Sequence, residues 1–130
     1  DDVINVSGHR ISSAEIESAS IAYDAAIMEA AAVGCRDPIT GSKVVLFYVL
    51  NKQTSIDHEL LKVFIVNKLT PNHMPWKVIK IECLPKTKSG KIARRLLRRV
   101  IDGNKPSNKE DLSTIINYNE FLDSLNLINF

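Results

Sequence analysis

The sequence predicts an α+β fold in which a small β-sheet, a hairpin plus additional strands, is flanked by helices. A hairpin is expected because two strand-like runs, residues 27–34 and 43–50, are joined by the turn-forming segment 36–41, which contains Asp, Pro and Gly. Helices are expected because residues 56–69 and 92–101 repeat apolar side chains at intervals of three and four. Strands and helices are thus mixed within one chain of 130 residues.

The N-terminal segment predicts a short strand followed by a helix. Val3–Val6 has strand-forming side chains and leads into the turn formers Ser7 and Gly8. The sequence Ser12-Ser13-Ala14-Glu15 then has the spacing of a capping box, in which a serine and a glutamate three positions later satisfy unpaired N–H groups at a helix start. We expect this helix to end near Ala22.

The middle of the chain predicts a second helix and a further strand. The apolar face of residues 56–69 is interpreted as core rather than as a site. Pro71 should end this helix, because proline has no backbone N–H to continue the helical hydrogen bonds. Trp76–Cys83 is then read as a strand. The apolar face of the helix comprises Leu60, Leu61, Phe64, Ile65 and Leu69.

The most informative segment is Leu84-Pro85-Lys86-Thr87-Lys88-Ser89-Gly90-Lys91, together with residues 92–101 behind it. Residues 86–99 hold seven basic side chains and no acidic one. On a helix, the apolar half of 92–101 should pack on a core, and the half that carries four arginines should lie in water. The Ser-Gly pair before Lys91 favours a turn, so this lysine is expected where a mobile loop becomes a helix.

Three interpretations compete for this segment. A Walker-type phosphate loop needs glycine at position 85 and serine or threonine at 92, whereas Pro85 and Ile92 stand there, so it is rejected. Clustered arginines favour a nucleic-acid patch, but no aromatic side chain is interleaved to stack on bases, and the chain carries a net charge of only +2. A solvated basic helix face explains residues 92–101 but not the loop before them.

Residues 84–92 resemble the last sequence motif of the adenylate-forming enzymes, which comprise acyl-CoA synthetases, luciferases and peptide-synthetase adenylation domains. A second motif of these enzymes is similar to Asp1-Asp2-Val3-Ile4-Asn5-Val6-Ser7-Gly8-His9-Arg10-Ile11, followed by Ala14-Glu15-Ile16-Glu17. Both motifs are closest in form to those of the AMP-forming acetyl-CoA synthetases, and the tail from Asp102 to Thr114 is also similar to theirs. The resemblance therefore covers nearly the whole chain.

This resemblance implies that residues 1–130 form the mobile C-terminal domain of an ATP-dependent, AMP-forming acetyl-CoA (short-chain acyl-CoA) synthetase. Residues 1–11 would be the hinge and the CoA-side motif, residues 84–101 the catalytic lysine loop and basic helix, and residues 102–130 a C-terminal tail. Such an enzyme activates acetate as acetyl-adenylate and transfers the acetyl group to CoA. The implied substrates are acetate, ATP and CoA, and the implied partner is an N-terminal adenylation domain. That domain would bind Mg²⁺ and select the acyl chain, so the fragment alone would be inactive.

The resemblance also assigns roles to single residues. Lys91 would be the catalytic lysine of adenylation and a site of acetylation, which a lysine deacetylase would reverse. Asp1 would be the hinge residue. Ser7 and Gly8 would line the path of the CoA pantetheine, and Arg10 would contact the ATP phosphate.

One position departs from the acetyl-CoA synthetase pattern. Val66 stands where those enzymes usually have an arginine for the CoA phosphates, and Lys68 is the nearest substitute charge. The exact CoA phosphate contact is therefore left open. His9 is assigned a structural role.

A noncatalytic binding module is the alternative from another functional class. Its basic helix, residues 91–101, would bind nucleic acid or a protein partner. The acetyl-CoA synthetase interpretation instead predicts no nucleic-acid binding at physiological salt.

The composition, 45% hydrophobic and 25% charged, is ordinary for one globular domain. No apolar run has the length of a membrane span, and the cysteines and histidines lack the spacing of a metal site. We therefore expect an intracellular, cytoplasmic protein with no membrane association and no metal bound by this segment.

Overall fold

A computed structural model describes residues 2–104, 106 and 113–128. The chain divides into two compact units, Asp1–Lys80 and Ile81–Phe130.

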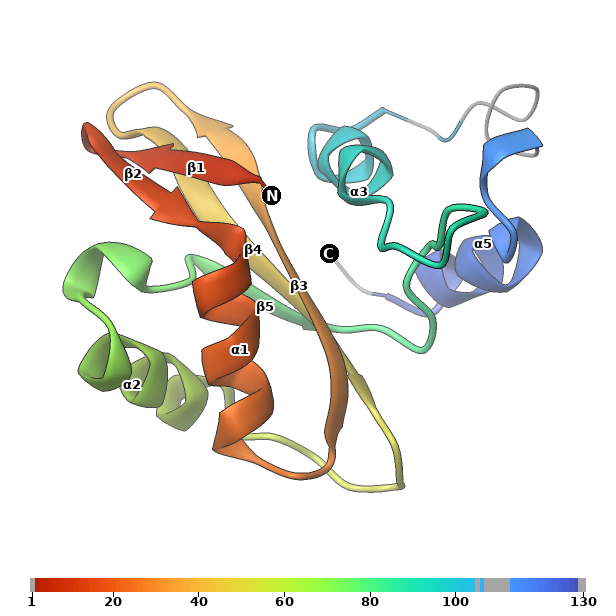
Figure 1. The fold of residues 1–130 in the computed structure, drawn as a ribbon, viewed down its shortest axis with the longest axis horizontal. Coiled ribbons are helices and arrows are strands. Elements are labelled where there is room, and N and C mark those ends of the chain that lie inside the picture. Colours follow the sequence, from red (N-terminus) through yellow and green to blue (C-terminus); the bar gives the residue numbers. More distant parts are fainter. Residues whose placement is uncertain (1, 105, 107–112, 129–130) are drawn as a thin grey trace. The chain divides into compact units, whose positions relative to one another are not determined.

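The first unit is built on a five-stranded sheet with the order β2-β1-β4-β3, in which β5 also pairs with β4 (Figure 1). All pairs are antiparallel except β4 with β5, which is parallel. The predicted hairpin is confirmed, and its strands reach further into the turn than expected. The strands are β1 (Val3–Val6), β2 (His9–Ser12), β3 (Ile27–Asp37), β4 (Gly41–Leu50) and β5 (Lys77–Lys80).

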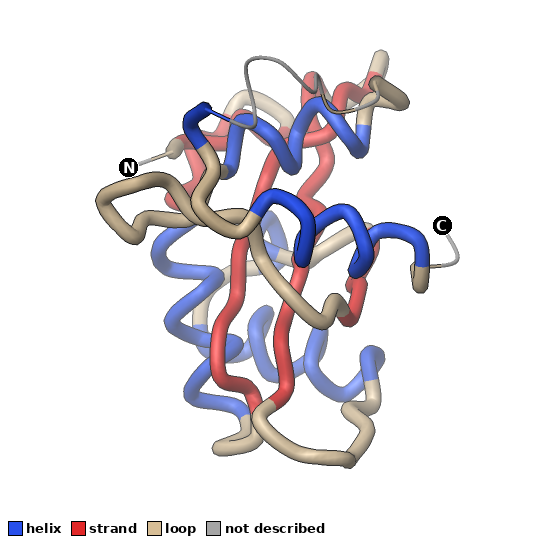
Figure 2. Tube along the Cα trace, turned by 90° about the vertical axis from the view of Figure 1, so that its right-hand side faces the viewer, coloured by secondary structure: helices blue, strands red, loops and turns tan. Residues whose placement is uncertain are grey.

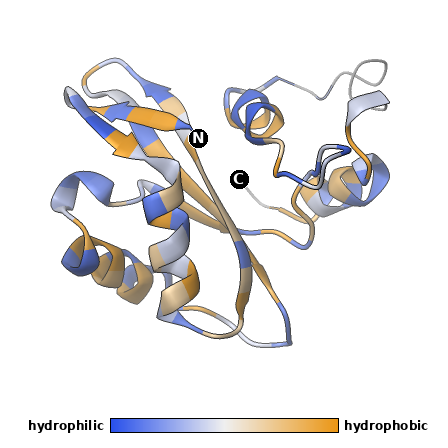
Figure 3. Ribbon diagram, viewed as in Figure 1, coloured by the Kyte–Doolittle hydropathy of each residue, from blue (hydrophilic) through white to orange (hydrophobic). Residues whose placement is uncertain are grey.

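Two helices, α1 (Ser13–Tyr23) and α2 (His58–Lys68), pack beside one another in this unit, and the short 3-10 helix η1 (Pro71–His73) follows α2 (Figure 1). The rings of Tyr23 and Phe64 meet between the two helices, with centroids 5.3 Å apart. In Figure 3 the helices carry both hydrophilic and hydrophobic segments, as expected when one face is buried and the other is in water. The core contains Ile16 and Ala19 of α1, Leu61 and Ile65 of α2, and Ile4, Leu46 and Tyr48 of the sheet.

Strand β2 was not predicted, although the turn before it was. Ser7 and Gly8 both have positive φ, 50° and 83°, and they connect paired residues Val6 and His9. A two-residue turn with two positive φ angles matches the twist of an antiparallel pair and sends the chain back as a second strand. The motif at the N-terminus is therefore a hairpin rather than a strand that leads directly into a helix.

The predicted capping box at the start of α1 is wrong. Ser12 is the N-cap residue, but its side chain makes no capping hydrogen bond. The N–H of Ser13 instead donates to the main-chain carbonyl of Asp2 over 3.0 Å. Ser12 also belongs to β2 and pairs with Val3, so the start of α1 is tied to the hairpin through main-chain contacts and not through the expected side-chain cap.

Helix α2 agrees with the prediction in position but not in every core residue. Leu61 and Ile65 are fully buried, whereas Leu60 is 57% exposed, so Leu60 lies outside the buried face. The helix begins at a cap that was not predicted, since the Asp57 carboxylate accepts hydrogen bonds from the N–H groups of Glu59 and Leu60. The strand expected at 76–83 is shorter and comprises β5 alone.

The second unit contains α3 (Arg94–Ile101) and α5 (Tyr118–Asn126), seen as blue tubes in Figure 2. Helix α3 begins two residues later than predicted, because Ile92 pairs with Lys86 and the N–H of Ala93 donates to the carbonyl of Pro85 over 2.8 Å. Leu96 and Leu97 are buried as expected. The basic half is less solvated than predicted. Arg95 is exposed, but Arg94, Arg98 and Arg99 are partly buried and have interaction partners.

In the expected C-terminal tail, Tyr118 and Phe121 of α5 are buried. Cys35 and Cys83 do not form a disulfide. Among the described residues, no helix is both long enough and apolar enough to cross a membrane.

Candidate functional site

The Ser7-Gly8 turn forms the exposed tip of the β1–β2 hairpin. It is held from one side, because the N–H of Ser7 donates to the carbonyl oxygen of Thr40 over 2.8 Å. Val6 also pairs with Gly41 at the start of β4. A Cβ added to Gly8 would meet no atom within 4 Å. Crowding by other residues of this chain therefore does not require glycine at this position, whereas the positive φ favours it.

The carboxylate of Asp37 organises the turn that holds Ser7. Its Oδ2 accepts hydrogen bonds from the N–H of Ile39 at 3.2 Å and from the N–H and the hydroxyl of Thr40, each at 2.7 Å. The ammonium of Lys43 lies 3.3 Å from Oδ1. These donors, chiefly the main-chain N–H of Thr40, lower the pKa of Asp37 from 3.8 to about 2. The turn is thus fixed by an ionised carboxylate at neutral pH.

Arg10 lies on the exposed face of the β1–β2 hairpin, opposite the face that carries the buried side chains. It pairs with Asn5, while the neighbouring pair, Ile4 and Ile11, is buried. Because successive residues of a strand face opposite sides, Arg10 and Asn5 share the exposed face. Ser7, Gly8 and Arg10 are therefore brought together on one hairpin, all exposed.

The loop before α3 closes on itself around Thr87. The N–H of Thr87 donates to the carbonyl of Lys91 over 2.8 Å, and the N–H of Gly90 donates to the carbonyl of Thr87 over 2.9 Å. The hydroxyl of Thr87 accepts from the N–H of Lys91 at 3.3 Å and lies 3.0 Å from the hydroxyl of Ser89. Gly90 has φ 85°, which completes the turn without steric cost.

Lys91 is exposed at the end of this closed loop. The prediction that Lys91 stands at the junction of loop and helix needs correction, since α3 begins three residues later, at Arg94. Its backbone is fixed on both sides, by Thr87 through hydrogen bonds and by Ile92 through the pairing with Lys86. The long side chain, by contrast, is in solvent. A fixed backbone with a free ammonium suits a lysine that must reach into a site formed elsewhere.

Asn117 also contacts Leu84 and Lys86, which lead into the lysine loop and are called its stem below. The sequence patterns did not identify Asn117. Its side-chain oxygen accepts from the N–H of Lys86, and its side-chain NH₂ donates to the carbonyl of Leu84. No local pattern pointed to it, because the contact joins positions thirty-one or more residues apart.

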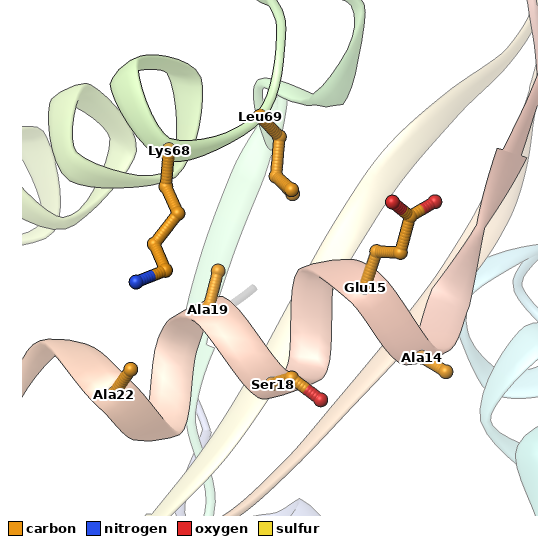
Figure 4. A pocket seen from close by; sticks show the side chains of 7 residues that line it. All are labelled: Ala14, Glu15, Ser18, Ala19, Ala22, Lys68 and Leu69. Carbon is orange, nitrogen blue, oxygen red and sulfur yellow. The ribbon is translucent and has the colours of Figure 1, made fainter.

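A groove of about 510 Å³ lies between α1 and the end of α2 (Figure 4). Small side chains of α1 line it together with Glu15 and Lys68. Lys68, the substitute considered for the missing arginine at Val66, is exposed. Its ammonium lies 5.8 Å from the centre of the Phe64 ring. The groove residues are Ala14, Glu15, Ser18, Ala19, Ala22, Lys68 and Leu69.

The remaining site predictions can be placed only in part. Asp1, the expected hinge, lies outside the described residues. Ser7, Gly8 and Arg10 belong to the first unit and Lys91 to the second. Across residues 2–104, 106 and 113–128, no group of three His, Cys, Asp or Glu side chains could hold a metal ion.

Comparison with known proteins gives a consistent result. Residues 15–91 match the family described as the AMP-binding enzyme C-terminal domain. The chain is 44% identical over 127 residues to acetyl-coenzyme A synthetase 1 of Saccharomyces cerevisiae and 45% identical over 122 residues to acetyl-coenzyme A synthetase 2 of Candida albicans. Each alignment covers 90% of this chain but 18% of the relative. The chain thus spans about a fifth of the length of the relatives it matches.

Solved structures show the same likeness. The crystal structure of an acyl-CoA synthetase from Brucella canis superposes with a TM-score of 0.72 and 36% identity, over 78% of this chain and 19% of the other. Apo MatB from Rhodopseudomonas palustris superposes with a TM-score of 0.73 and 27% identity, over 78% and 20% of the two chains. The small sheet flanked by helices is therefore an arrangement found within much larger proteins.

Proposed function

This chain belongs to the AMP-binding enzyme C-terminal domain family, and we propose that it is the C-terminal part of an AMP-forming acetate–CoA ligase. The observation that carries the proposal is the identity of 40% or more, over nine-tenths of the chain, with proteins named acetyl-coenzyme A synthetase. The closed loop that presents Lys91 to solvent supplies a group with the charge that the first step needs.

The proposed reaction has two steps. In the first, a carboxylate oxygen of acetate attacks the α-phosphorus of ATP, and pyrophosphate leaves with the electrons of the broken P–O bond. In the second, the CoA thiolate attacks the carbonyl carbon of acetyl-adenylate, and AMP leaves as the thioester forms. Negative charge gathers on phosphate and carboxylate oxygens in the first step. A positioned cation therefore lowers that barrier.

Lys91 is proposed as that cation. At about 4 Å and an effective dielectric constant of about 20, its attraction to one oxyanion is roughly 4 kcal/mol. A lysine suits this role because its charge is compact and its stem is flexible. Acetylation of Nζ would remove the charge, and a deacetylase would restore it. We propose this modification as an off switch for the first step.

Ser7, Gly8 and Arg10 are proposed for the nucleotide and CoA contacts. The exposed Ser7-Gly8 turn has no side chain at Gly8, so a slender pantetheine arm could lie along its backbone. Arg10, on the outer face of the same hairpin, would contact the ATP phosphate. The described residues offer no carboxylate cluster that fits Mg²⁺, so we place the metal that accompanies ATP on the larger domain.

The alternative, a noncatalytic module that uses the basic helix, is not supported by the relatives. Arg94, Arg98 and Arg99 are partly buried and have interaction partners. Fewer basic side chains of the helix are therefore available to bind nucleic-acid phosphates, which also weakens this alternative.

The test is the activity of the full-length protein. We expect acetate, ATP and CoA to yield acetyl-CoA, AMP and pyrophosphate in equal amounts, while residues 1–130 alone yield none of them. Comparing kcat/KM for acetate and propionate would then identify the preferred acyl chain. Formation of ADP and phosphate in place of AMP and pyrophosphate, or no product with either acid, would overturn the proposal.

A further inference from the structure

Asn117 stands at a helix start but does not cap the helix. It is the N-cap residue of α5, with φ −120° and ψ 42°, and its side chain makes no capping hydrogen bond. Asparagine is among the preferred N-cap residues because its side-chain oxygen can accept from the first N–H groups of a helix. In this protein the Asn117 side chain makes no such hydrogen bond to α5, and its amide contacts other residues instead.

All the hydrogen-bonding groups of the Asn117 amide contact the segment that leads into the lysine loop. An asparagine side chain offers one acceptor oxygen and two N–H donors. Its Oδ1 accepts from the N–H of Lys86 at 2.9 Å. Its Nδ2 donates to the carbonyl of Leu84 at 2.8 Å and to the sulfur of Cys83 at 3.0 Å.

The residues just before Asn117 extend this contact along the stem of the loop. The N–H of Ile116 donates to the carbonyl of Lys86 over 2.9 Å, and Ile115 pairs with Thr87. Both main-chain groups of Lys86 are therefore bound by residues 116–117. Thr87 in turn donates to the carbonyl of Lys91. A short series of main-chain contacts thus connects Asn117 with the lysine at the end of the loop.

We propose that Asn117 is a positioning residue that holds the stem of the lysine loop so that Lys91 reaches the adenylation site in the correct place. The inference rests on the proposed function, since it assigns a purpose to the same lysine. Asn117 acts through Lys86 and Thr87 and touches no reacting atom. It lies outside residues 15–91, the part of the chain that matches the family. Misplacement of a catalytic group by about 1 Å costs a factor on the order of 100 in rate.

The experiment uses the full-length protein and two variants. Asn117→Ala removes all three hydrogen bonds. Asn117→Ser also removes the amide but leaves a hydroxyl that can cap α5, so its stability should equal or exceed that of Asn117→Ala. Asn119→Ala is the matched control, because Asn119 is an exposed asparagine on the same helix. Three quantities are measured: acetate-dependent pyrophosphate exchange, thioester formation from preformed acetyl-adenylate and CoA, and amide hydrogen exchange in residues 84–92.

We expect both Asn117 variants to lower kcat for pyrophosphate exchange by a factor on the order of 10 to 100, with KM for ATP nearly unchanged. Thioester formation from the adenylate should stay within a factor of about two, because Lys91 serves only the first step. Amides of residues 86–91 should exchange faster than in the wild type and in Asn119→Ala.

A double variant separates positioning from general stability. If Asn117 acts through Lys91, then adding Asn117→Ala to Lys91→Ala should cause no further loss of pyrophosphate exchange. Additive losses, equal loss of both half-reactions, or unchanged hydrogen exchange in the loop would each overturn the inference. If the wild type showed no acetate-dependent exchange at all, the proposed function would fail, and the hydrogen-exchange comparison alone would then decide whether Asn117 holds the loop.

Discussion

The main-chain N–H of Ser7 donates a hydrogen bond to the carbonyl oxygen of Thr40 over 2.8 Å, so the tip of one hairpin is held by the turn of another. Asp37 determines the shape of that turn. The position of the Ser7-Gly8 turn therefore depends on a carboxylate thirty residues away in the sequence.

Asp37→Asn should destabilise residues 1–130 at neutral pH, because the amide keeps the shape of the carboxylate but loses its charge. The pKa of Asp37 is lowered from 3.8 to about 2 in the folded protein, so ionisation contributes stability that is present above pH 3.8 and is lost as pH falls through 2. The difference in urea midpoint between wild type and variant should be largest at pH 6 and should approach zero near pH 2. Asp123→Asn, at an exposed carboxylate, controls for the loss of a charge. A constant difference at all pH values would contradict the assignment.

Gly8→Leu and Gly8→Asn together separate a turn role from a CoA role. Gly8 has φ 83°, where most side chains cost about 1 to 2 kcal/mol, whereas asparagine is tolerated. If Gly8 lines the pantetheine path, both variants should lose thioester formation while pyrophosphate exchange is spared. Wild-type behaviour of Gly8→Asn in both assays would show that glycine serves the turn alone.

Lys91→Ala in the full-length protein should lower acetate-dependent pyrophosphate exchange by a factor on the order of 100 to 1000, as does the loss of one oxyanion donor. Thioester formation from preformed acetyl-adenylate should persist. Lys88→Ala is the matched control, since Lys88 is exposed in the turn of the same loop, and Lys86→Ala is a second control. A larger effect at Lys88 than at Lys91, or equal loss of both half-reactions in Lys91→Ala, would refute the role of this loop.

His58 should make the first unit less stable in acid. Its Nε2 lies 2.8 Å from the hydroxyl of Tyr48. Burial, followed by the nearby charge of Lys62, lowers the pKa of His58, against a smaller opposing effect of Asp57 and Glu59.

Because the folded pKa lies below the unfolded value of 6.5, the unfolded chain binds more protons as pH falls, and stability present above pH 6.5 is lost below it. His58→Gln can keep a hydrogen bond to Tyr48 without titrating. The difference in urea midpoint between wild type and His58→Gln should therefore change between pH 7 and pH 5. A flat difference would disprove this.

The sequence could predict those features that depend on neighbours along the chain. The β3–β4 hairpin and α2 followed from local patterns of apolar and turn-forming residues. The Ser7-Gly8 turn was also visible, but the strand behind it was not, because His9–Ser12 has little strand pattern of its own. The lysine loop was identified by its motif, whereas its internal closure around Thr87 was not.

Contacts between distant positions could not be predicted. Ser12 has the sequence of a cap, yet its side chain makes no capping hydrogen bond, and the N–H of the next residue, Ser13, donates to the carbonyl of Asp2, just before the first strand. Asn117 has the sequence of a cap as well, and its amide binds Lys86 instead. The contacts that replace the expected local ones join residues that are distant in the sequence, and single-sequence patterns do not contain such partners.

The parallel pairing of β5 with β4 has a consequence for how the protein folds. Strand β3 meets β4 through one tight turn, whereas β5 reaches β4 only after the chain has passed through α2 and η1. Closing the longer connection costs more chain entropy before any contact compensates for it. Strand β5, which leads into the segment of Lys91, should therefore join the sheet after β3 during folding. In pulse-labelling hydrogen exchange, amides of β5 should become protected after those of β3, and simultaneous protection would refute this order.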